Sequence, residues 1–462
     1  MIFVDGTEVM LDIRFVRDNP EEVKRGLQRK GVDFDVDAFL KLDERRRKKI
    51  QEVDDMRSIQ NTAAGDIAKI KEKENRDKKI SESKELKERL IRSEEELKVL
   101  DAEFAGLIVG IPNLPLKNVP DGLGEKGNIV LREVDENGTA YPRGESPKPK
   151  FSFTPRDYMD IAKKLDIIDT ERASRVSGSR FGYLKREAAL LEFALVRYAF
   201  DLVCDEKNIE SVAKELDLSL KPIPFIPIIP PALVKPESMR AMGYVERGGD
   251  EIYHIEKDDM YVVGTSEQSV GPMHIHETFE EKDLPMRYIS FSTCFRREAG
   301  SYGKDTKGIL RVHQFDKAEM VIFATPETSE EEHLLLRGIE ERLMKTLKIP
   351  YHVLNCCAGD LGDPAAAKYD IEAWLPGQNG GKGEYRETHS TSNTTDFQAR
   401  RLNIKMRKKD GTTQFVHMLN GTAFAVGRMI IAIIENYQQE DGSVRIPDVL
   451  QKYIGGMKEI RR

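Results

Sequence analysis

About half of the side chains between residues 36 and 100 are charged, and this stretch limits the possible folds more than any other part of the sequence. It contains 18 Lys or Arg and 16 Asp or Glu, so it has too little apolar surface to form a globular core. Its apolar residues nevertheless recur at alternating spacings of four and three, as the seam of a coiled coil requires. The seam positions are Lys49, Val53, Met56, Gln60, Ala63, Ile67 and Ile70 in the first half, and Ser83, Leu86, Leu90, Ser93, Leu97, Leu100, Phe104 and Leu107 in the second. Both halves are therefore predicted to be helical.

The two halves do not share one register. Continuing the first frame beyond Ile70 would place Glu74, Asp77, Ser81, Lys84 and Glu88 in the seam, so the register resets between Ile70 and Ser83. A turn at this reset predicts an antiparallel helical hairpin, an arm that covers about residues 36–107. Helices of roughly 30 residues would reach about 45 Å at 1.5 Å per residue.

Charge is divided unevenly along the chain. The net charge is −7, and the segment 36–100 carries +2, which leaves −9 for the rest. Near the predicted tip, KIKEKENRDKK (residues 69–79) has six basic and three acidic residues. Such a segment can be the solvated face of a coiled coil, or it can contact an RNA backbone, from which Lys and Arg release counterions. The negative total argues against nonspecific binding of nucleic acids over the whole surface.

The sequence changes character after Gly110. IPNLPLKNVPDG (residues 111–122) is rich in proline and is interpreted as a linker. Beyond it, the apolar pattern of residues 187–203 predicts a helix, and the proline-limited FIPIIPPALV (225–234) predicts an extended segment. We therefore expect two domains, residues 1–112 with the arm and residues 113–462 as a globular core.

Cysteine usage and apolar runs indicate the compartment. The four cysteines, Cys204, Cys294, Cys356 and Cys357, include no C-x-x-C pair, so neither a disulfide framework nor a cysteine zinc site is suggested. The sequence has no run of 18 apolar residues, and its start, MIFVDGTEVMLDIRF, lacks the basic and apolar regions of a signal peptide. We expect a soluble cytoplasmic protein that makes no contact with a membrane.

The segment MHIHE (residues 273–277) contains His274, His276 and Glu277, three residue types that can bind zinc. Positions two apart diverge on a helix, and no cysteine lies nearby in the sequence. We therefore interpret these side chains as solvated helix residues.

Residues 295–320, FRREAGSYGKDTKGILRVHQFDKAEM, hold many charges around a loop that contains glycine. If strands flank the loop SYGKDTKG, alternation with period two puts Arg296 and Glu298 on one face. The same alternation groups Arg311, Phe315 and Glu319. Together they offer guanidiniums for phosphates, a ring for a base and carboxylates for amino groups. A solvated hairpin is the alternative.

This set suits a nucleoside triphosphate that is bound without a P-loop. The nearest P-loop candidate, GQNGGKGEY (377–385), has the wrong spacing and lacks Ser or Thr after Lys382.

Residues 295–320 resemble motif 2 of the class II aminoacyl-tRNA synthetases, in the form typical of seryl-tRNA synthetases. Five further segments resemble the same family. They are NGTAFAVGRMIIAIIENYQ (420–438, motif 3), IPPALVKPESM (229–239, motif 1), GTSEQ (264–268, the Thr-x-Glu serine loop), YRETHSTSNTTDFQARR (385–401) and MLDIRFVRDNPEEVKRGLQRKGVDFD (10–35). The resemblance runs in order from Met10 to about Ile460 and includes the arm, whereas residues 1–9 lie outside it.

The resemblance implies an α+β fold, with an antiparallel coiled-coil arm and a class II core whose antiparallel sheet is flanked by helices. It implies a serine–tRNA ligase that uses ATP and Mg²⁺ to make seryl-adenylate, and then transfers serine to the terminal ribose of tRNA(Ser). Whether tRNA(Sec) is also charged stays open. Motif 1 implies a homodimer, and residues 1–112 become a tRNA-binding domain.

The resemblance also implies roles for individual residues. For ATP they are Arg296 at the α-phosphate, Glu298 at the adenine amino group, Val312 and Phe315 at the base, Arg311 at the outer phosphates, Arg428 at the γ-phosphate, and Glu387 and Ser390 as ATP and metal ligands. For serine they are Thr265, Glu267, Arg296, Glu319 and Thr422. Arg296 and Arg428 are the expected catalytic residues, and the expected tRNA contacts are Lys69, Lys71, Lys73, Arg76, Lys78 and Lys79.

Two other functions compete with this one. A ligase of the same fold could load an amino acid onto a carrier protein, but such relatives lack the long arm. A scaffold descended from a synthetase could bind tRNA without catalysis, but it has no need for Arg296, Glu298, Glu319, Glu387 and Arg428 together.

Overall fold

The computed structural model describes residues 12–245, 249–300, 303, 305 and 307–462; residues 1–9, to which the sequence assigns no function, lie outside them. The chain divides into two compact units. The first contains the described residues up to Gln28 together with Val32–Pro112, and the second contains Arg29–Gly31 and Asn113–Arg462. Across the described residues, no helix combines the length and apolar character that crossing a membrane requires.

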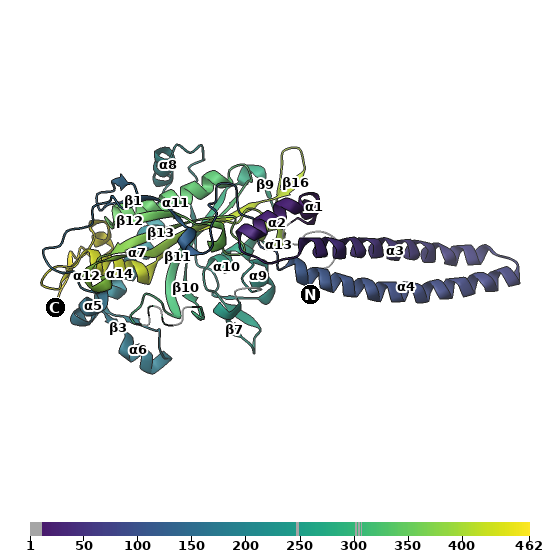
Figure 1. Ribbon diagram of the computed structural model, residues 1–462, viewed down its shortest axis with the longest axis horizontal. Helices are drawn as coiled ribbons and strands as arrows, with labels where there is room; N and C mark the ends of the chain where they lie inside the picture. Colours follow the sequence, from purple (N-terminus) through teal and green to yellow (C-terminus); the bar gives the residue numbers. More distant parts are fainter. Residues whose placement is uncertain (1–11, 246–248, 301–302, 304, 306) are drawn as a thin grey trace. The chain divides into compact units, whose positions relative to one another are not determined.

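The first unit is helical. Its elements are α1 (Ile13–Asp18), α2 (Pro20–Arg29), α3 (Val36–Lys69) and α4 (Lys73–Ile108). Asp35 caps the start of α3 by accepting a hydrogen bond from the amide of Ala38. The long helices α3 and α4 run side by side in opposite directions (Figure 1), joined by a short turn after Lys69. The predicted antiparallel hairpin is thus confirmed, including its turn between Ile70 and Ser83.

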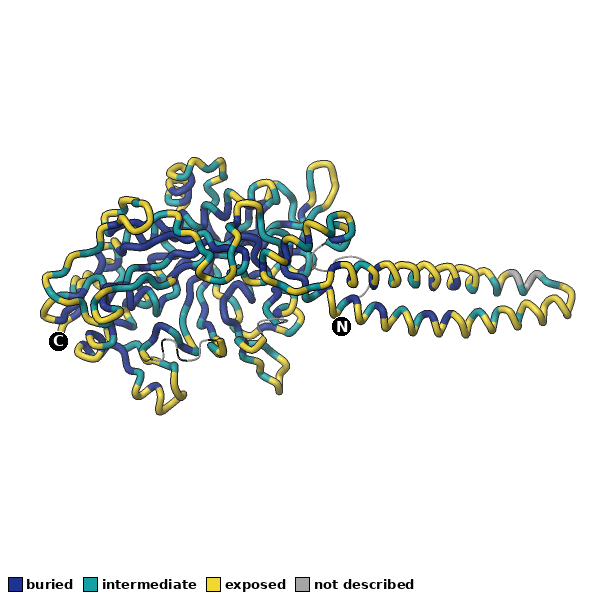
Figure 2. The backbone as a smooth tube through the Cα atoms, in the orientation of Figure 1, coloured by how far each residue is buried: buried dark blue, intermediate teal, exposed yellow. Residues whose placement is uncertain are grey.

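The arm is held together by a narrow apolar seam with ion pairs beside it. Val53, Met56 and Leu90 are buried in this seam, although most of the surface of both helices is exposed (Figure 2). Pairs such as Lys49 with Glu96 (2.7 Å) connect α3 to α4. Packing of the seam, more than helix propensity, stabilises helices of this kind.

One predicted seam position is wrong. Leu107 is 40% exposed, and Ile108 is fully buried in its place. A straight α-helix has 3.6 residues per turn and drifts from a repeat of 3.5, so the buried stripe has moved by one residue at the end of α4.

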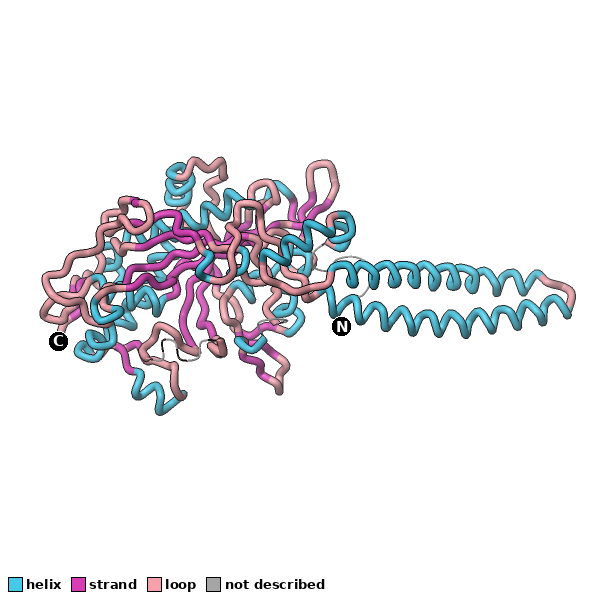
Figure 3. Tube along the Cα trace, viewed as in Figure 1, coloured by secondary structure: helices cyan, strands magenta, loops and turns pink. Residues whose placement is uncertain are grey.

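The second unit is built on a nine-stranded sheet in the order β2-β1-β12-β13-β14-β17-β11-β10-β5. Neighbouring strands are antiparallel except for β10 and β5, which are parallel. The bounds are β1 Ile129–Val134, β2 Ala140–Tyr141, β5 Ile226–Ile228, β10 Met286–Phe295, β11 Gln314–Ala324, β12 Tyr351–Asn355, β13 Ala367–Leu375, β14 Glu384–Asn393 and β17 His417–Ala425. Figure 3 shows these strands as one layer.

The helices of the second unit include three that pack on this sheet: α7 (Arg186–Val203), α11 (Ser329–Thr346) and α14 (Val426–Asn436). The predicted helix over 187–203 is thus confirmed. The shorter helices are α5 Tyr158–Leu165, α6 Thr170–Ser177, α8 Glu206–Glu215, α9 Pro236–Ala241, α10 Glu267–Val270, α12 Gln378–Gly381, α13 Phe397–Leu402 and α15 Asp448–Gln451.

Small sheets complete the unit. Their strands are β3 Ile168–Asp169 with β4 Tyr183–Leu184, β6 Leu233–Val234 with β7 Tyr253–Ile255 and β8 Met260–Val262, β9 Thr278–Glu280 with β15 Lys405–Arg407 and β16 Thr413–Phe415, and β18 Val444–Arg445 with β19 Glu459–Ile460. The predicted extended segment 225–234 is confirmed as β5 and β6, separated by the two prolines at 230 and 231.

Alternation along β11 gives the large sheet two different faces. Ala318, Met320 and Ile322 belong to the main hydrophobic core, to which α7, α11 and α14 also contribute. The residues between them point the other way, and Lys317 and Glu319 line a cavity. The fold is therefore α+β, with an antiparallel sheet that helices cover on one face and that carries a cavity on the other, as the resemblance implied.

Candidate active site

A cavity of about 700 Å³ lies in the second unit, and all the residues that the sequence assigns to ATP and serine line it. They are Thr265, Glu267, Arg296, Glu298, Arg311, Val312, Phe315, Glu319, Glu387, Ser390, Thr422 and Arg428. More than 160 positions separate the first from the last. The fold therefore gathers residues from six separate segments around one space.

Regular elements position seven of these twelve side chains, among them Glu267 in α10 and Glu387 in β14. Phe315 and Glu319 belong to β11, Ser390 to β14 and Thr422 to β17, three strands that are neighbours in the sheet. Glu319 pairs with Thr422 in the register of β11 and β17. Arg428 lies in the first turn of α14, where backbone N–H groups lack partners within the helix and the dipole favours an anion.

The alternation predicted on both sides of the hairpin loop is correct for Phe315 and Glu319, which lie on a strand, and not for the residues nearer the loop. β10 and β11 pair antiparallel, but β10 ends at Phe295 and β11 begins at Gln314. Arg296, Glu298 and Arg311 lie beyond the strands, and Glu298 has a left-handed φ of 53°. Period two therefore does not explain why these three residues face the cavity.

Local contacts position these three residues instead. The Nε of Arg296 donates to the carbonyl of Gly264 at 3.1 Å, and its guanidinium lies 5.3 Å from the centre of the Phe315 ring. Arg311 pairs with Asp305 at 3.0 Å and with Glu298 at 3.5 Å. One end of the cavity thus combines two guanidiniums, a carboxylate and an aromatic ring.

Positive charge surrounds the carboxylate of Glu387. Arg428 lies 3.5 Å from this carboxylate and also donates to the Glu387 carbonyl at 2.8 Å. Desolvation raises the pKa of Glu387, but the charges of Arg428, Lys368, Arg296 and Arg311 outweigh it, so the pKa is lowered. Glu387 is therefore ionised at neutral pH and can serve as a hard oxygen ligand.

Two further carboxyl groups, those of Glu319 and Glu267, lie in a buried part of the lining, and the pKa of Glu267 is shifted in the direction opposite to that of Glu387. Glu319 is 2% exposed and Glu267 is 3% exposed. Tyr244 and Gln398 each donate to Glu267 at 2.8 Å. Burial first, and then the charge of Glu319, raise the pKa of Glu267. Thr422 donates to Glu319 at 3.2 Å.

The sequence did not identify several members of this lining. Lys317, Tyr244 and Asn420 also line the cavity. Lys317 had a usable signal, because period two on one strand places it on the same face as Phe315 and Glu319. Tyr244 has none, since only the folding of distant segments brings it to Glu267.

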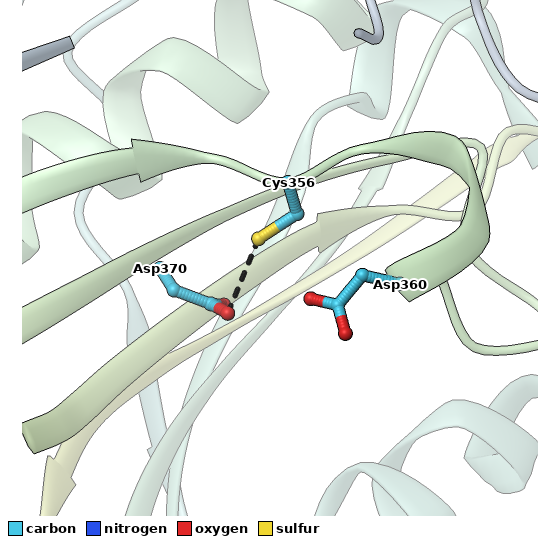
Figure 4. Close-up of side chains that lie close together, drawn as sticks. All are labelled: Cys356, Asp360 and Asp370. Atoms are coloured by element: carbon cyan, nitrogen blue, oxygen red, sulfur yellow. Dashed lines mark hydrogen bonds between the residues drawn. The ribbon is translucent and has the colours of Figure 1, made fainter. Parts of the chain in front are cut away.

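One other cluster in the described residues has the composition of a metal site. Cys356, Asp360 and Asp370 lie together (Figure 4), and the thiol of Cys356 donates to Asp370 at 3.2 Å. The ammonium of Lys368 lies 3.2 Å from carboxylate oxygens of both Asp360 and Asp370. A side-chain cation therefore already neutralises this cluster.

The two histidines of MHIHE have different surroundings. His274 hydrogen-bonds to Glu277 at 2.7 Å and to Tyr288 at 2.9 Å, and it packs against Phe279 and Phe323. The interpretation of His274 as a solvated helix residue is therefore wrong, whereas His276 is exposed. His274 packs within a partly buried aromatic cluster because the chain turns there to bring Tyr288 and Phe323 of the sheet against it.

The residues assigned to tRNA lie in the first unit. Lys71, Lys73, Arg76, Lys78 and Lys79 are all exposed, and four of them belong to the first two turns of α4. The side chain of Lys69, at the end of α3, lies outside what the structure describes.

Two family profiles match the chain. The profile for the seryl-tRNA synthetase N-terminal domain matches residues 10–115. The profile for the tRNA synthetase class II core domain (G, H, P, S and T) matches residues 252–437. The second match contains every cavity residue predicted from the sequence.

Curated relatives are similar over nearly the whole chain. The serine–tRNA ligase of Dictyoglomus turgidum is 43% identical over 456 residues, 98% of this chain and 99% of the relative. That of Thermobifida fusca is 42% identical over 96% of this chain and 98% of its own length.

Solved structures show the same similarity. Seryl-tRNA synthetase from Pyrococcus horikoshii, complexed with ATP, superposes with a TM-score of 0.85 at 39% identity, covering 98% of this chain and 99% of that one. The cytoplasmic serine–tRNA ligase of Naegleria fowleri, in complex with AMP, gives 0.81 at 34% identity, covering 98% and 99%. The chain therefore belongs to the seryl-tRNA synthetase family of class II aminoacyl-tRNA synthetases, the ligases that join serine to tRNA.

Proposed function

We propose that the cavity binds ATP and L-serine side by side, and that the twelve lining residues predicted from the sequence contact one substrate or the other. At the base, Phe315 stacks on adenine, Glu298 accepts from its amino group and the backbone of Val312 lies beside it. Arg311 contacts the outer phosphates. The contact of Arg311 with Glu298 and the proximity of Phe315 to Arg296 support this grouping.

Arg296 is the proposed centre of the first reaction step. One carboxylate oxygen of serine forms a bond to the α-phosphorus, and the bond to the bridging oxygen of pyrophosphate breaks. The carboxylate is already ionised near pH 7, so the step depends on positioning and on neutralising charge rather than on a general base. Arg296 contacts the α-phosphate and the serine carboxylate, and Arg428 contacts the γ-phosphate at the start of α14.

Glu387 and Ser390 are the proposed magnesium ligands. Both line the cavity, both offer hard oxygen donors, and Glu387 is ionised at neutral pH. Two protein ligands suit Mg²⁺, which keeps several waters and shares phosphate oxygens. When bound, the ion would neutralise charge on the phosphate groups.

Serine is proposed to bind where Thr265, Glu267, Glu319 and Thr422 meet. Glu319 accepts from its ammonium and, with Thr422, pairs with its side-chain hydroxyl. Since Tyr244 and Gln398 already donate to Glu267, Glu267 contributes mainly negative charge and Thr265 a hydroxyl or backbone contact. A pocket whose polar groups pair with the hydroxyl rejects alanine, because these groups would otherwise stay unpaired.

The second step is proposed to transfer serine to tRNA(Ser) that is held by the arm. The exposed basic side chains near the turn between α3 and α4 support contact with the RNA backbone. Large exposed apolar side chains in α7 and in residues 226–233 support a homodimer. The proposed compartment is the cytoplasm, which suits four free cysteines.

One observation carries the proposal, the convergence of twelve separately assigned residues on a single cavity. It is tested by serine-dependent exchange between ATP and pyrophosphate. The wild type is expected to exchange with serine and not with alanine, and R296A is expected to lose at least about 100-fold in rate, the effect typical of removing a donor that stabilises developing charge.

Exchange without serine, or an unchanged R296A, would overturn the assignment. Charging of tRNA(Ser) and of a carrier protein, measured side by side, then separates the two kinds of ligase. We expect the protein to charge the tRNA and not the carrier protein.

A further inference from the structure

A lysine lies within the serine end of the cavity, where the proposed function needs negative charge. The side chain of Lys317 is 8% exposed and lines the cavity on β11, between Phe315 and Glu319. Its ammonium nitrogen is 2.6 Å from Oε2 of Glu319. A buried ammonium is costly unless it is paired, so its presence here requires a reason.

The contact with Lys317 is made to one oxygen of the Glu319 carboxylate, Oε2, and not to the other. Lys317 and Thr422 both contact Oε2. Within the ranges that the structure describes, no hydrogen-bond donor reaches Oε1 of Glu319. The carboxylate is therefore fixed at one oxygen, and the other is left for a ligand in the cavity.

Lys317 also supplies a positive charge close to several buried carboxyl groups. Burial raises the pKa of Glu267, the nearby charge of Glu319 adds to the rise, and Lys317 opposes it. Glu340 of α11 is fully buried under β14 and β17, and its pKa is raised by burial first and then by Glu319. Without a cation, buried carboxyl groups this close cannot all be ionised.

We infer that Lys317 is a positioning residue for serine, which orients the Glu319 carboxylate so that its free oxygen accepts from the serine ammonium and hydroxyl. This inference rests on the proposed serine site. It assigns Lys317 no contact with the reacting atoms and no part in ATP binding.

Two substitutions separate the charge of Lys317 from its bulk. K317M keeps an unbranched apolar stem and removes the ammonium. K317R keeps a cation that can donate to a carboxylate. The matched control is K214M on the exposed face of α8, where Glu210, one turn away, is the ion-pair partner of Lys214 among the described residues.

The KM values for serine and for ATP, measured by pyrophosphate exchange, give the readout. K317M is expected to raise the KM for serine about 10- to 100-fold, the loss typical of a charge-assisted hydrogen bond, and the KM for ATP less than about threefold. K317R is expected to recover part of the loss, and K214M to leave both values unchanged.

E319Q distinguishes failure of this inference from failure of the proposed function. If E319Q leaves the KM for serine unchanged, the serine site itself is misassigned. If E319Q raises it and K317M does not, or if K317M raises both KM values equally, the role of Lys317 is refuted and the site survives. If K317M does not fold by thermal melting, K317Q replaces it, and failure of both to fold would show that Lys317 is structural and contradict the inference.

Discussion

Glu192 of α7 and Asp316 of β11 form a carboxyl pair on the helix-covered face of the sheet, on the strand whose other side lines the cavity. Asp316 accepts a hydrogen bond from Thr293 at 2.6 Å. Burial first, and then the charge of Asp316, raise the pKa of Glu192 to about 8. A carboxyl that keeps its proton up to this pH makes the stability of the folded chain depend on pH.

The sign of this dependence follows from proton uptake. The unperturbed pKa of Glu192 is 4.5, so between about pH 4.5 and 8 the folded chain holds a proton that the unfolded chain releases. The contribution of Glu192 to stability therefore falls as pH rises through this window and levels off above it. E192Q removes this contribution, so its free energy of unfolding relative to the wild type is expected to increase from pH 5 to pH 8.

Urea unfolding at several pH values measures this difference. E206Q, at an exposed position of α8, is the matched control and is expected to differ from the wild type by a constant amount. A constant difference for E192Q would show that Glu192 is ionised like an ordinary surface carboxylate.

Single residues differ in how far the sequence could predict them. Phe315 and Glu319 follow from alternation on one strand, and the same reasoning would have found Lys317. Glu298 faces the cavity through a left-handed backbone conformation, which no periodic pattern predicts. Glu267 receives hydrogen bonds from Tyr244 and Gln398, 23 and 131 positions away, and such contacts exist only in the folded chain.

Among the elements, the arm has the simplest physical basis. The ammonium of Lys49 on α3 lies 2.7 Å from the carboxylate of Glu96 on α4. The two helices are therefore close enough at this level for a short glycine-rich linker to replace residues 50–95. This replacement removes the buried side chains of Val53, Met56 and Leu90 together, so none of these three is left exposed without the others.

The shortened arm is expected to spare adenylate formation and to abolish charging of tRNA(Ser). The physical reason is that the exposed lysines and Arg76 near the turn supply the proposed RNA contacts. Pyrophosphate exchange measures adenylate formation and aminoacylation measures charging of the tRNA, both on the same preparation. A full-length variant with K71E, K73E and R76E is the companion test, since it changes charge and keeps the helices. Unchanged charging by either protein would refute the role of the arm.

Elements with strong local patterns were predictable from the sequence, and others were not. The two arm helices and the helix over 187–203 follow from apolar spacing. The ends of β10 and β11 do not, because both strands stop where their pairing stops, short of the residues that alternate in sequence. The parallel pair of β15 with β9 joins segments about 127 positions apart, so its partner could not be inferred from either segment.

At the scale of the whole molecule, the second unit leaves large apolar side chains uncovered. Phe193 of α7 is 68% exposed, and Ile229 is 74% exposed. Exposed groups of this size commonly mark a protein interface, and together with the resemblance to motif 1 they support a homodimer. The chain has a mass of 52.6 kDa, so the expected mass in solution is about twice this value.

F193E is expected to shift the mass toward that of a single chain, because a carboxylate in an apolar interface is desolvated without a partner. Light scattering after gel filtration measures the change. V99E, at an arm position that is 67% exposed, introduces the same charge on an exposed apolar site and is expected to leave the mass unchanged. A wild type that is already monomeric would contradict the proposed dimer.

The proposed function requires one cavity to hold the base, the α-phosphate and serine at the same time. A crystal structure of the whole chain with a non-hydrolysable seryl-adenylate analogue tests it most directly. We expect adenine stacked on Phe315, the phosphate within hydrogen-bond distance of Arg296, and the seryl ammonium at Oε1 of Glu319. An analogue bound outside this cavity, or bound there with its seryl group away from Glu319, would contradict the claim.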